Sequence, residues 1–399
     1  MCPGCYKPNV EGYCPACRKG LFDGKKVSHI LPFEAPKDKN VSTYSERTKG
    51  LSISGVQPKY SLKLEGNTLV LTDKGGEYIL KPISPAIGIQ RADQVPENEH
   101  LTMHIANVYG ISTAVNALIY FQDGTPAYIT RRFDLKPAGG KYQQEDFAQL
   151  MGKTKDSHGE FFKYDGTYED MWIAMKKFVP AYMPQAERLF EIILFNYIFS
   201  NGDAHLKNFS LIESENLGDY VLSKSYDLLC TVIHTSNETD SALNLYDGDM
   251  DVQEDVWGIT GRYGQHQFRE LARRLGIQEA RANRIISKYL ERREVILTMI
   301  DGSFLSEEAK QLYKKNYLEK IRQLGLTEVQ IASKLGVKSK ADFPPKFPVR
   351  FTNIRGLVFE GELTGVMGDN KYSFLQSRPA IDNPKTTING DMMVDVVAI

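Results

Sequence analysis

The segment Gly202-Asp203-Ala204-His205-Leu206-Lys207-Asn208 places an aspartate and an asparagine with four residues between them. In phosphoryl-transfer enzymes this Asp-x4-Asn spacing lets one loop orient the attacking hydroxyl, accept its proton and bind magnesium through the asparagine amide oxygen. An apolar run over residues 189–199 precedes the loop, and a short apolar segment over residues 209–212 follows it. Such flanks predict that a buried helix and a buried strand hold the loop rigidly.

Three further positions fit the parts of a magnesium-ATP site, in chain order. Lys81 ends a short apolar strand-like segment, where a phosphate-binding lysine would lie. Glu99, or with less support Glu97, begins the helix that follows and would orient that lysine. Asp227 follows another predicted strand, so a hairpin could return it beside Asn208 as a second magnesium ligand. Each residue alone is common at surfaces and helix starts, and only the ordered set favours a kinase.

The elements that must position these residues begin with a small α+β lobe. Alternating apolar residues and glycine-containing turns predict a meander of three strands, then a helix, then two more strands. The helix over residues 97–109 has Leu101, Ile105 and Val108 on one face and stops at Gly110. The strands are expected at Tyr60–Leu64, Thr68–Leu71, Tyr78–Lys81, Ala117–Phe121 and Ala127–Thr130.

Helical periodicity dominates from about residue 144 to about residue 325, and its clearest buried stripe runs along residues 190–197. From Pro345 the pattern becomes strand-like again, over residues 356–361, 371–375 and 392–397. Residues 326–337 read like the middle of a helix-turn-helix, although an ordinary pair of helices is the more common outcome for such a pattern.

Four of the five cysteines, Cys2, Cys5, Cys14 and Cys17, follow the spacing C-x2-C-x8-C-x2-C. Two such pairs can each turn a tight knuckle that points two thiolates at one ion, which gives a structural zinc site with four thiolate ligands. The alternative is a tail with four reduced thiols. The fifth cysteine, Cys230, lies in an apolar setting and is expected to be a small core residue.

Charge and length exclude some classes of protein. The 399 residues carry 49 Lys and Arg against 50 Asp and Glu, so the chain as a whole has no bias toward nucleic acid. No apolar run approaches the roughly 20 residues that cross a bilayer, and the first residues do not follow a signal-peptide pattern. We therefore expect a cytoplasmic protein with no membrane partner.

The chain contains neither GxGxxG nor GxxxxGK[ST], which argues against a standard protein kinase and against a P-loop NTPase. Before the first strand it reads Ser52-Ile53-Ser54-Gly55-Val56-Gln57-Pro58-Lys59. This segment resembles the nucleotide loop of the HipA family of bacterial serine/threonine kinases. The resemblance covers residues 50 to 325. Its other motifs are similar to that family's ATP-lysine strand, helix start, hinge, acidic turn, catalytic loop and magnesium aspartate, and they are residues 76–82, 97–99, 132–134, 144–147, 201–210 and 226–227.

The resemblance implies a role for each matched residue. Asp203 would be the catalytic base, Lys81 would bind the α and β phosphates of ATP, and Asn208 and Asp227 would hold Mg²⁺. Glu99 would orient Lys81. A phosphate on the nucleotide loop adds about −1.5 to −2 of charge and would oppose ATP binding; the implied autophosphorylation sites are Ser52 and Ser54. The remaining residues of the ATP site would be Ser54, Gly55, Val56, Gln57, Arg132, Phe133 and His205, of which His205 would brace the loop.

The implied fold is α+β and bilobal, HipA/protein-kinase-like, with a small β-rich N-lobe and a mostly helical C-lobe. An N-terminal four-cysteine knuckle and a β-rich C-terminal tail flank it. We expect the knuckle and a linker at residues 1–38, the N-lobe at 39–143, the C-lobe at 144–330 and the strand-rich extension at 331–399; linker-like composition runs from residue 18 to 50. Longer family members carry a β-rich module before the nucleotide loop. This chain resembles the short, HipT-type form, for which a separate small protein would supply that module.

The implied activity is Mg-ATP-dependent phosphorylation of a protein serine or threonine, with aminoacyl-tRNA synthetases as a target class. The family commonly acts as a toxin that a HipB-like antitoxin restrains, so DNA would be contacted only through the antitoxin. Two alternatives stay open: a kinase for a lipid or small molecule, and a weakly active, nucleotide-dependent binding module of a DNA-linked complex. The intact Lys81, Asp203, Asn208 and Asp227 argue against the second.

Overall fold

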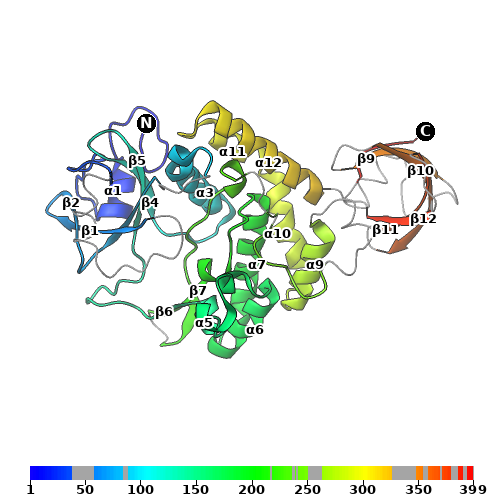
Figure 1. The fold of residues 1–399 in the computed structure, drawn as a ribbon, viewed down its shortest axis with the longest axis horizontal. Coiled ribbons are helices and arrows are strands. Elements are labelled where there is room, and N and C mark those ends of the chain that lie inside the picture. The colour runs from blue at the N-terminus through cyan, green and yellow to red at the C-terminus, as the bar shows by residue number, and fades with distance from the viewer. Residues whose placement is uncertain are drawn as a thin grey trace. The chain divides into compact units, whose positions relative to one another are not determined.

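The computed structural model describes residues 1–37, 58–83, 89–215, 218–235, 239, 241–249, 263–325, 347–353, 358–368, 371–378, 385–389 and 393–398. The chain divides into two compact units (Figure 1). The first unit contains residues 1–165, 174–242 and 293–316, and the second contains residues 166–173, 243–292 and 317–399. Among the described helices, none combines the length and apolar character that a bilayer crossing requires.

A five-stranded antiparallel sheet with the order β2-β1-β3-β5-β4 is the main β element of the first unit (Figure 1). Its strands are β1 (Tyr60–Glu65), β2 (Thr68–Leu71), β3 (Tyr78–Pro82), β4 (Asn116–Tyr120) and β5 (Pro126–Arg131). The predicted meander was wrong in one respect, because β1 lies between β2 and β3. At residue 76 the chain passes close to the Ser61 side chain. A Cβ at this position would lie 1.7 Å from the Ser61 Oγ, so glycine leaves the room that this path needs.

Helix α3 (Val95–Tyr109) packs against β4 and β5 of this sheet. Pro96 stands in its first turn, where a missing N–H costs nothing. Gly110 ends the helix with a φ of 85°, a left-handed conformation that glycine adopts without strain. The helix is buried on more than its predicted apolar face, because Glu97 and Glu99 are buried as well as Leu101. It therefore carries charged groups into the interior of the unit.

The N-terminal segment also belongs to this core. Helix α1 (Pro15–Phe22) begins at Cys14. Leu21, Phe22, Val27 and Leu31 pack in one cluster with apolar residues of the sheet. The expectation of a linker from residue 18 is thus wrong for residues 18–37, because a few well-spaced apolar side chains cover the sheet despite the polar composition. Residues 38–50 of that predicted linker lie outside the described residues.

Short elements and one long helix surround the catalytic-loop sequence in the first unit. Helix α7 (Met183–Ile198) leads into the loop, and its predicted stripe is buried at Phe190, Ile193, Leu194 and Tyr197. A three-stranded sheet has the order β6-β7-β8; β6 precedes α7 in the chain, and β7 and β8 follow the loop. The bounds are β6 (Gln144–Asp146), α4 (Phe147–Leu150), α5 (Lys155–His158), η3 (Phe162–Tyr164), η4 (Leu206–Asn208), β7 (Ser210–Glu213), β8 (Tyr220–Leu222), η5 (Thr231–Ile233) and α11 (Arg293–Asp301), with η2 (Ala92–Gln94) preceding α3.

The second unit combines helices with a separate antiparallel sheet of order β12-β11-β10-β9-β13. Its helices include α9 (Gln265–Arg274) and α10 (Glu279–Glu291), and α6 (Tyr168–Phe178) and α12 (Glu307–Gly325) contribute residues to both units. The strands are β9 (Phe347–Asn353), β10 (Val358–Gly368), β11 (Lys371–Arg378), β12 (Lys385–Asn389) and β13 (Met393–Ala398).

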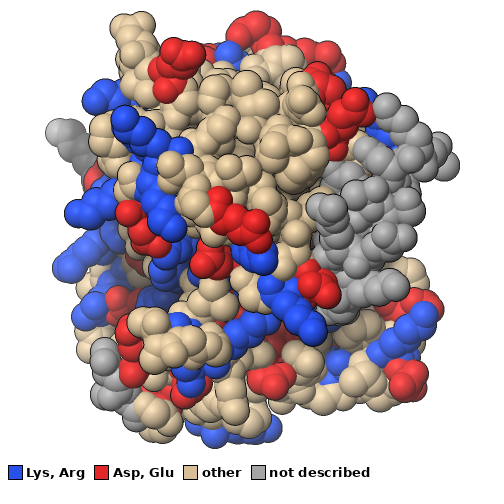
Figure 2. Space-filling view, turned by 90° about the vertical axis from the view of Figure 1, so that its left-hand side faces the viewer, with Lys and Arg blue, Asp and Glu red and all other residues tan. Residues whose placement is uncertain are grey.

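The expected fold class is confirmed, including the mixed α+β composition and the strand-rich tail. Residues 326–337, read as a possible helix-turn-helix, lie outside the described residues, and the domain boundaries stay a prediction. Figure 2 shows one face of the molecule, on which Lys and Arg side chains lie among Asp and Glu side chains. This mixture is in keeping with the formal net charge of −1.

Candidate active site

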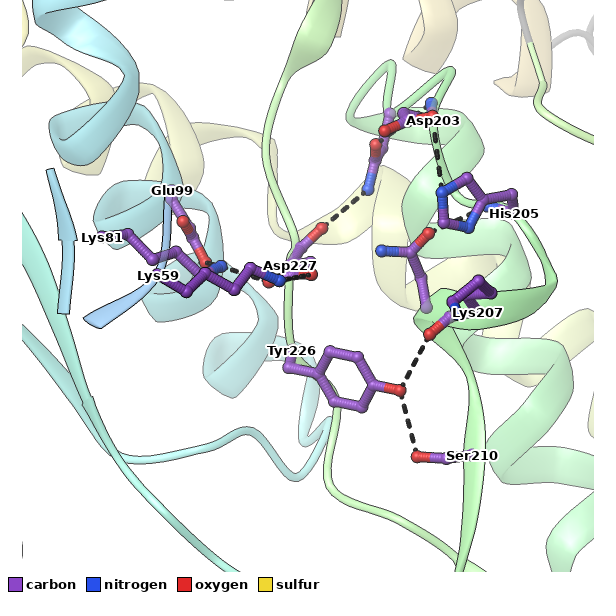
Figure 3. A network of polar contacts seen from close by, with 11 residues as sticks. Lys59, Lys81, Glu99, Asp203, His205, Lys207, Ser210, Tyr226 and Asp227 are labelled. Carbon is purple, nitrogen blue, oxygen red and sulfur yellow. Dashed lines mark hydrogen bonds and ion pairs between the residues drawn. The ribbon is translucent and has the colours of Figure 1, made fainter. Parts of the chain in front are cut away.

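Strand β3 and helix α3 bring Lys81 and Glu99 together in the interior of the first unit (Figure 3). Their side chains are 5% and 2% exposed, and Lys81 Nζ donates a hydrogen bond to Glu99 Oε1 at 2.5 Å. The same ammonium group donates to Asp227 Oδ1. Lys59 Nζ lies 3.3 Å from Asp227 Oδ2. Two cations and two carboxylates thus form one cluster, although they come from four separate positions along the chain.

Burial and ion pairing oppose each other in this cluster. Burial alone would lower the pKa of Lys81, but the carboxylates of Asp227 and Glu99 outweigh it and raise that pKa. Burial would raise the pKa of Asp227, yet Lys59 and Lys81 hold it well below its usual range. For Glu99 burial prevails, and its pKa is raised even though Lys81 acts against the shift, because the Asp227 charge adds to it. Lys81 and Asp227 are therefore charged at neutral pH.

The structure distinguishes the two glutamates proposed to orient the lysine. Lys81 pairs with Glu99. Glu97 is buried too, but its Oε2 finds no hydrogen-bond partner within the described part of the chain. Burial raises the pKa of Glu97 to about 7.

The loop after α7 exposes Asp203 and buries the histidine beside it. The Asp203 side chain is 49% exposed and His205 only 8%. Tyr164 donates its hydroxyl hydrogen bond to Asp203 Oδ1, and His205 Nε2 lies 3.8 Å from the same oxygen. The rings of Tyr164 and His205 meet edge to face, with 5.2 Å between centroids. Burial lowers the pKa of His205 to about 4, so its ring is neutral at pH 7; its expected role in bracing the loop stays a prediction.

Asn201 connects this loop to the segment that carries Asp227. Its Nδ2 donates to Asn196 Oδ1 at 2.8 Å and to the Asp227 backbone oxygen at 3.3 Å. Within the loop, Asn208 Oδ1 accepts the His205 backbone N–H at 3.2 Å. The positions of Asn208 and Asp227 are thus tied to one another through backbone groups.

Asn208 and Asp227 line the same small cleft, together with Asn201 and Tyr226. Magnesium prefers oxygen ligands and commonly keeps waters and substrate phosphates in its shell. Asn208 Oδ1 has a second lone pair beside the one that its hydrogen bond uses, and Asp227 contributes a carboxylate. The residues present therefore fit Mg²⁺, which would compete with Lys59 and Lys81 for the Asp227 oxygens.

The predicted hinge residues contact Tyr226 through Phe133. The Arg132 backbone N–H donates to Glu77 O at 2.9 Å, and its guanidinium donates to Asp134 Oδ1, also at 2.9 Å. Phe133 stacks on the ring of Tyr226, with centroids 6.1 Å apart. Tyr226 also donates its hydroxyl hydrogen bond to the Lys207 backbone oxygen at 3.1 Å. Tyr226 therefore contacts both the hinge and the loop, and Figure 3 shows it between Asp227 and Lys207.

The N-terminal cysteines also converge in the structure. The sulfur atoms of Cys2, Cys5, Cys14 and Cys17, from here on called the cysteine knuckle, all lie within 4.8 Å of one another. Cys230 is buried, as expected.

The sequence did not indicate some of these contacts, and some of the predicted site residues lie outside the described part of the chain. Lys59 and Asn201 stood inside the quoted motifs without a role, and their pairing with Asp227 emerges only in three dimensions. Tyr164 lies in the short 3-10 helix η3 between α5 and α6, where no periodic pattern marked it. The predicted nucleotide-loop residues Ser52, Ser54, Gly55, Val56 and Gln57 lie outside the described residues.

A buried lysine held by a helix glutamate, beside an aspartate and an Asp-x4-Asn loop, is the arrangement of protein-kinase-like phosphotransferases. The profile of the HipA-like C-terminal domain matches residues 51–295. The chain therefore belongs to the HipA-like C-terminal domain family, and the resemblance drawn from its motifs is confirmed.

The relatives of the chain agree with this family. A Haemophilus influenzae protein named "Putative kinase" is 25% identical over 330 residues, which are 79% of this chain and 94% of that protein. The Sinorhizobium fredii protein "Putative kinase Y4dM" is 32% identical over 230 residues, or 53% of each, so the chain spans about half of that relative's length. These relatives support a function of the kinase type.

One solved structure confirms the fold. It is the complex of the toxin–antitoxin proteins HipA and HipB with operator DNA from Shewanella oneidensis MR-1. The TM-score is 0.54 at 19% identity, and the match covers 74% of this chain and 73% of that chain.

Proposed function

We propose that the protein is a Mg-ATP-dependent protein serine/threonine kinase. One observation carries the proposal: Lys81 lies buried between Glu99 and Asp227, and Asp227 shares a cleft with Asn208 of the Asp203 loop. In this proposal Lys81 binds ATP phosphates, Glu99 orients Lys81, and Asp203 is the base. Mg²⁺ on Asn208 and Asp227 would neutralise phosphate charge during transfer.

The transfer step is balanced at Asp203. The acceptor hydroxyl oxygen forms a bond to the γ-phosphorus, the bond between that phosphorus and the β,γ-bridging oxygen breaks, and ADP leaves with the electron pair. Asp203 takes the hydroxyl proton. Tyr164 already donates to Oδ1 of this carboxylate, which leaves Oδ2 for the acceptor. The exposure of 49% of the Asp203 side chain supports access by a serine or threonine on a protein surface.

The lysines on Asp227 suggest how the site responds to nucleotide. In the structure both Lys59 and Lys81 neutralise Asp227. When Mg²⁺ binds and neutralises the Asp227 carboxylate, we expect Lys59 and Lys81 to pair with the ATP phosphates instead, because every charge then keeps a partner. Lys59 is the last residue of the segment that resembles the nucleotide loop, which suits a contact with phosphate.

The proposal extends to regulation and partners. Autophosphorylation of Ser52 or Ser54 would place negative charge where the ATP phosphates bind and would switch the kinase off. The fold match to HipA in a complex with HipB and operator DNA supports a HipB-like antitoxin as a partner, through which DNA would be reached indirectly. A small protein that resembles the N-terminal module of longer members is a further candidate partner.

The deciding experiment is the intact mass of the purified full chain after incubation with Mg-ATP. We expect the parent to gain the mass of one phosphate, mapped to Ser52 or Ser54, and Asp203→Asn to gain none. Asp23→Asn is the matched control, because Asp23 is exposed, pairs with Arg131 and directly follows α1, outside the site. Equal phosphate on parent and Asp203→Asn would refute the assignment of the base.

The acceptor class needs a second measurement. Radiolabelled ATP is offered to the parent with bacterial lysate proteins in one arm and with a metabolite and lipid extract in the other. Label on proteins at serine or threonine supports the proposal. Label on lipid or metabolite alone would replace it with a small-molecule kinase, and no label with intact ATP binding would indicate a nucleotide-dependent binding module.

A further inference from the structure

Residues next to the ligands of the cysteine knuckle contact α3, which carries Glu99, and the edge strand β4 of the sheet that contains Lys81. We propose that a zinc ion on these four cysteines holds α3 against the sheet, so that metal occupancy determines how well Glu99 meets Lys81. The knuckle would then be a positioning site for the kinase rather than an appendage. Only the turnover part of its test rests on the proposed function.

The sulfur geometry suits a tetrahedral metal. A zinc–sulfur bond of about 2.3 Å places neighbouring sulfurs of a tetrahedron roughly 3.8 Å apart. Cys5 Sγ and Cys14 Sγ lie 3.6 Å apart, and all four sulfurs lie within 4.8 Å of each other. A disulfide would require about 2.05 Å between sulfurs. Four protein thiolates close the coordination sphere, as in structural zinc sites.

Backbone groups around the sulfurs form a cradle. The backbone N–H groups of Gly4 and Cys14 point at Cys2 Sγ over 3.4 and 3.2 Å, and that of Cys17 points at Cys14 Sγ over 3.5 Å. Such N–H groups stabilise thiolate charge and orient the ligands. A Cβ on Gly4 would lie 2.7 Å from Cys17 Sγ, so a side chain at this position would collide with the ligand set.

The knuckle is tied to the edge strand β4 of the sheet that contains Lys81. Leu118 of β4 donates its backbone N–H to Pro3 O at 2.9 Å, and its own carbonyl accepts the Tyr13 hydroxyl at 2.7 Å. Pro3 lies between the first two ligands and Tyr13 directly precedes the third. Both halves of the cysteine knuckle are therefore hydrogen-bonded, through Pro3 and Tyr13, to the same residue of the sheet, Leu118.

A second set of contacts ties the knuckle to α3, five residues or fewer from Glu99. The Tyr6 ring, next in the chain to Cys5, packs on His100 and His104, with centroids 4.9 and 5.6 Å apart, and on Phe304 at 5.3 Å. Tyr6 has a φ of 61°, a left-handed conformation that is strained for a residue with a Cβ. Something must hold Tyr6 there, and the ligand Cys5 beside it would do so.

These contacts predict what removal of the metal does. Without an ion, the turns at residues 2–6 and 13–17 lose the centre that joins them. Tyr6 can then relax to an ordinary conformation and leave α3. The helix would keep its apolar contacts with the sheet but lose the brace at His100, one residue from Glu99.

The first experiment measures the metal and the helix without relying on catalysis. Full chain purified in reducing buffer is assayed for zinc by elemental mass spectrometry, and we expect one zinc per chain. Amide hydrogen exchange over Val95–Tyr109 is followed before and after a zinc-selective chelator, and we expect exchange to accelerate about tenfold or more. A chain that holds no zinc when zinc is supplied, or an unchanged exchange rate on stripping, would overturn the proposal.

The second experiment separates the brace from the metal. Tyr6→Phe keeps the ring, and the Tyr6 hydroxyl has no hydrogen-bond partner among the described residues, so this variant is the control. Tyr6→Ser removes the ring. We expect both variants to hold one zinc, and only Tyr6→Ser to show faster α3 exchange and about tenfold lower kcat. Identical exchange in the two variants would refute the brace. Absent turnover in the parent would count against the proposed function alone, because zinc content and exchange remain measurable.

Discussion

Replacing Lys81 by methionine tests the buried cluster most directly. Methionine keeps a long flexible stem in the same space and removes only the ammonium group. Asp227 then keeps Lys59 at 3.3 Å and has a side chain that is 22% exposed. Glu99 is 2% exposed and loses the cation that it meets at 2.5 Å. We therefore expect most of the lost stability to come from the unpaired, buried carboxylate of Glu99.

The magnitude follows from the geometry of the pair. At 2.5 Å two unit charges attract by roughly 7 kcal/mol when the effective dielectric constant is about 20. Desolvation offsets most of this attraction while the pair is intact, but removing one partner typically costs about 3–5 kcal/mol because a charge stays buried alone. We expect Lys81→Met to lower the unfolding free energy by that amount at pH 8. The loss should shrink toward pH 5, since Glu99 can take up a proton and become neutral.

The assay is a double-mutant cycle with Lys81→Met, Glu99→Gln and both together, followed by urea denaturation at pH 5 and pH 8. Because the pair is in contact, we expect a coupling energy of about 2 kcal/mol or more at pH 8, with the double variant more stable than Lys81→Met. ATP turnover should be lost in both variants that lack the lysine. Coupling near zero, or a Lys81→Met loss that is equal at both pH values, would refute the burial argument. Turnover in the double variant would refute the phosphate role of Lys81.

Two further substitutions test neighbouring groups. Tyr164→Phe removes one hydrogen bond to Asp203, so we expect kcat to fall by about fivefold with the KM for ATP unchanged; unchanged kcat in steady-state kinetics would contradict it. Burial raises the pKa of Glu97 to about 7, so the folded chain holds a proton that the unfolded chain releases above its ordinary pKa of about 4.3. That stabilisation is complete below pH 4.3 and is lost as pH rises through 7. Glu97→Gln should therefore add up to about 3 kcal/mol at pH 8 and little at pH 4; equal shifts of Tm at both pH values would contradict this.

The elements that depend on local patterns were predictable from the sequence. Alternation marked the strands of the first sheet, and apolar spacing marked the buried stripe of α7. The chain order of Lys81, Glu99, Asp203, Asn208 and Asp227 placed them near one another because a lysine strand, a glutamate helix and a loop–hairpin unit recur together in kinase-like sites. The structure brings Lys81, Glu99 and Asp227 into contact, while their roles stay proposals.

The features that depend on distant contacts could not be read from the sequence. The position of β1 between β2 and β3 depends on which strand edges pair. The alternation of apolar and polar residues would be the same for either strand order. The folding of residues 18–37 onto the sheet depends on a few apolar side chains in a polar segment, such as Phe22. Tyr164 belongs to the candidate site only through its hydrogen bond to Asp203, which is 39 residues away in the chain.

Hydrogen bonds to two strained backbone residues fix the positions of the loop and of the Asp227 segment. Ser200, just before the loop, has a φ of 51°, and Asp227 has a φ of 55°; this left-handed conformation costs a non-glycine residue about 1–2 kcal/mol. The carbonyl of each strained residue is held by a neighbour. Ser200 O accepts both the backbone N–H and the hydroxyl of Thr231 at 3.0 Å, and Asp227 O accepts Asn201 Nδ2 at 3.3 Å.

These bonds cross between the two segments rather than running within either one. Thr231 lies beyond Asp227 yet holds the start of the loop, where its Oγ1 also accepts the Gly202 N–H at 2.9 Å. Asn201 lies in the loop yet holds Asp227. Each segment therefore stabilises the strained residue of the other, and relaxation of one would release both. The start of the loop and the backbone at Asp227 are consequently fixed relative to one another, as the proposed Mg²⁺ site on Asn208 and Asp227 would require in order to offer its ligands without reorganising at the moment of transfer.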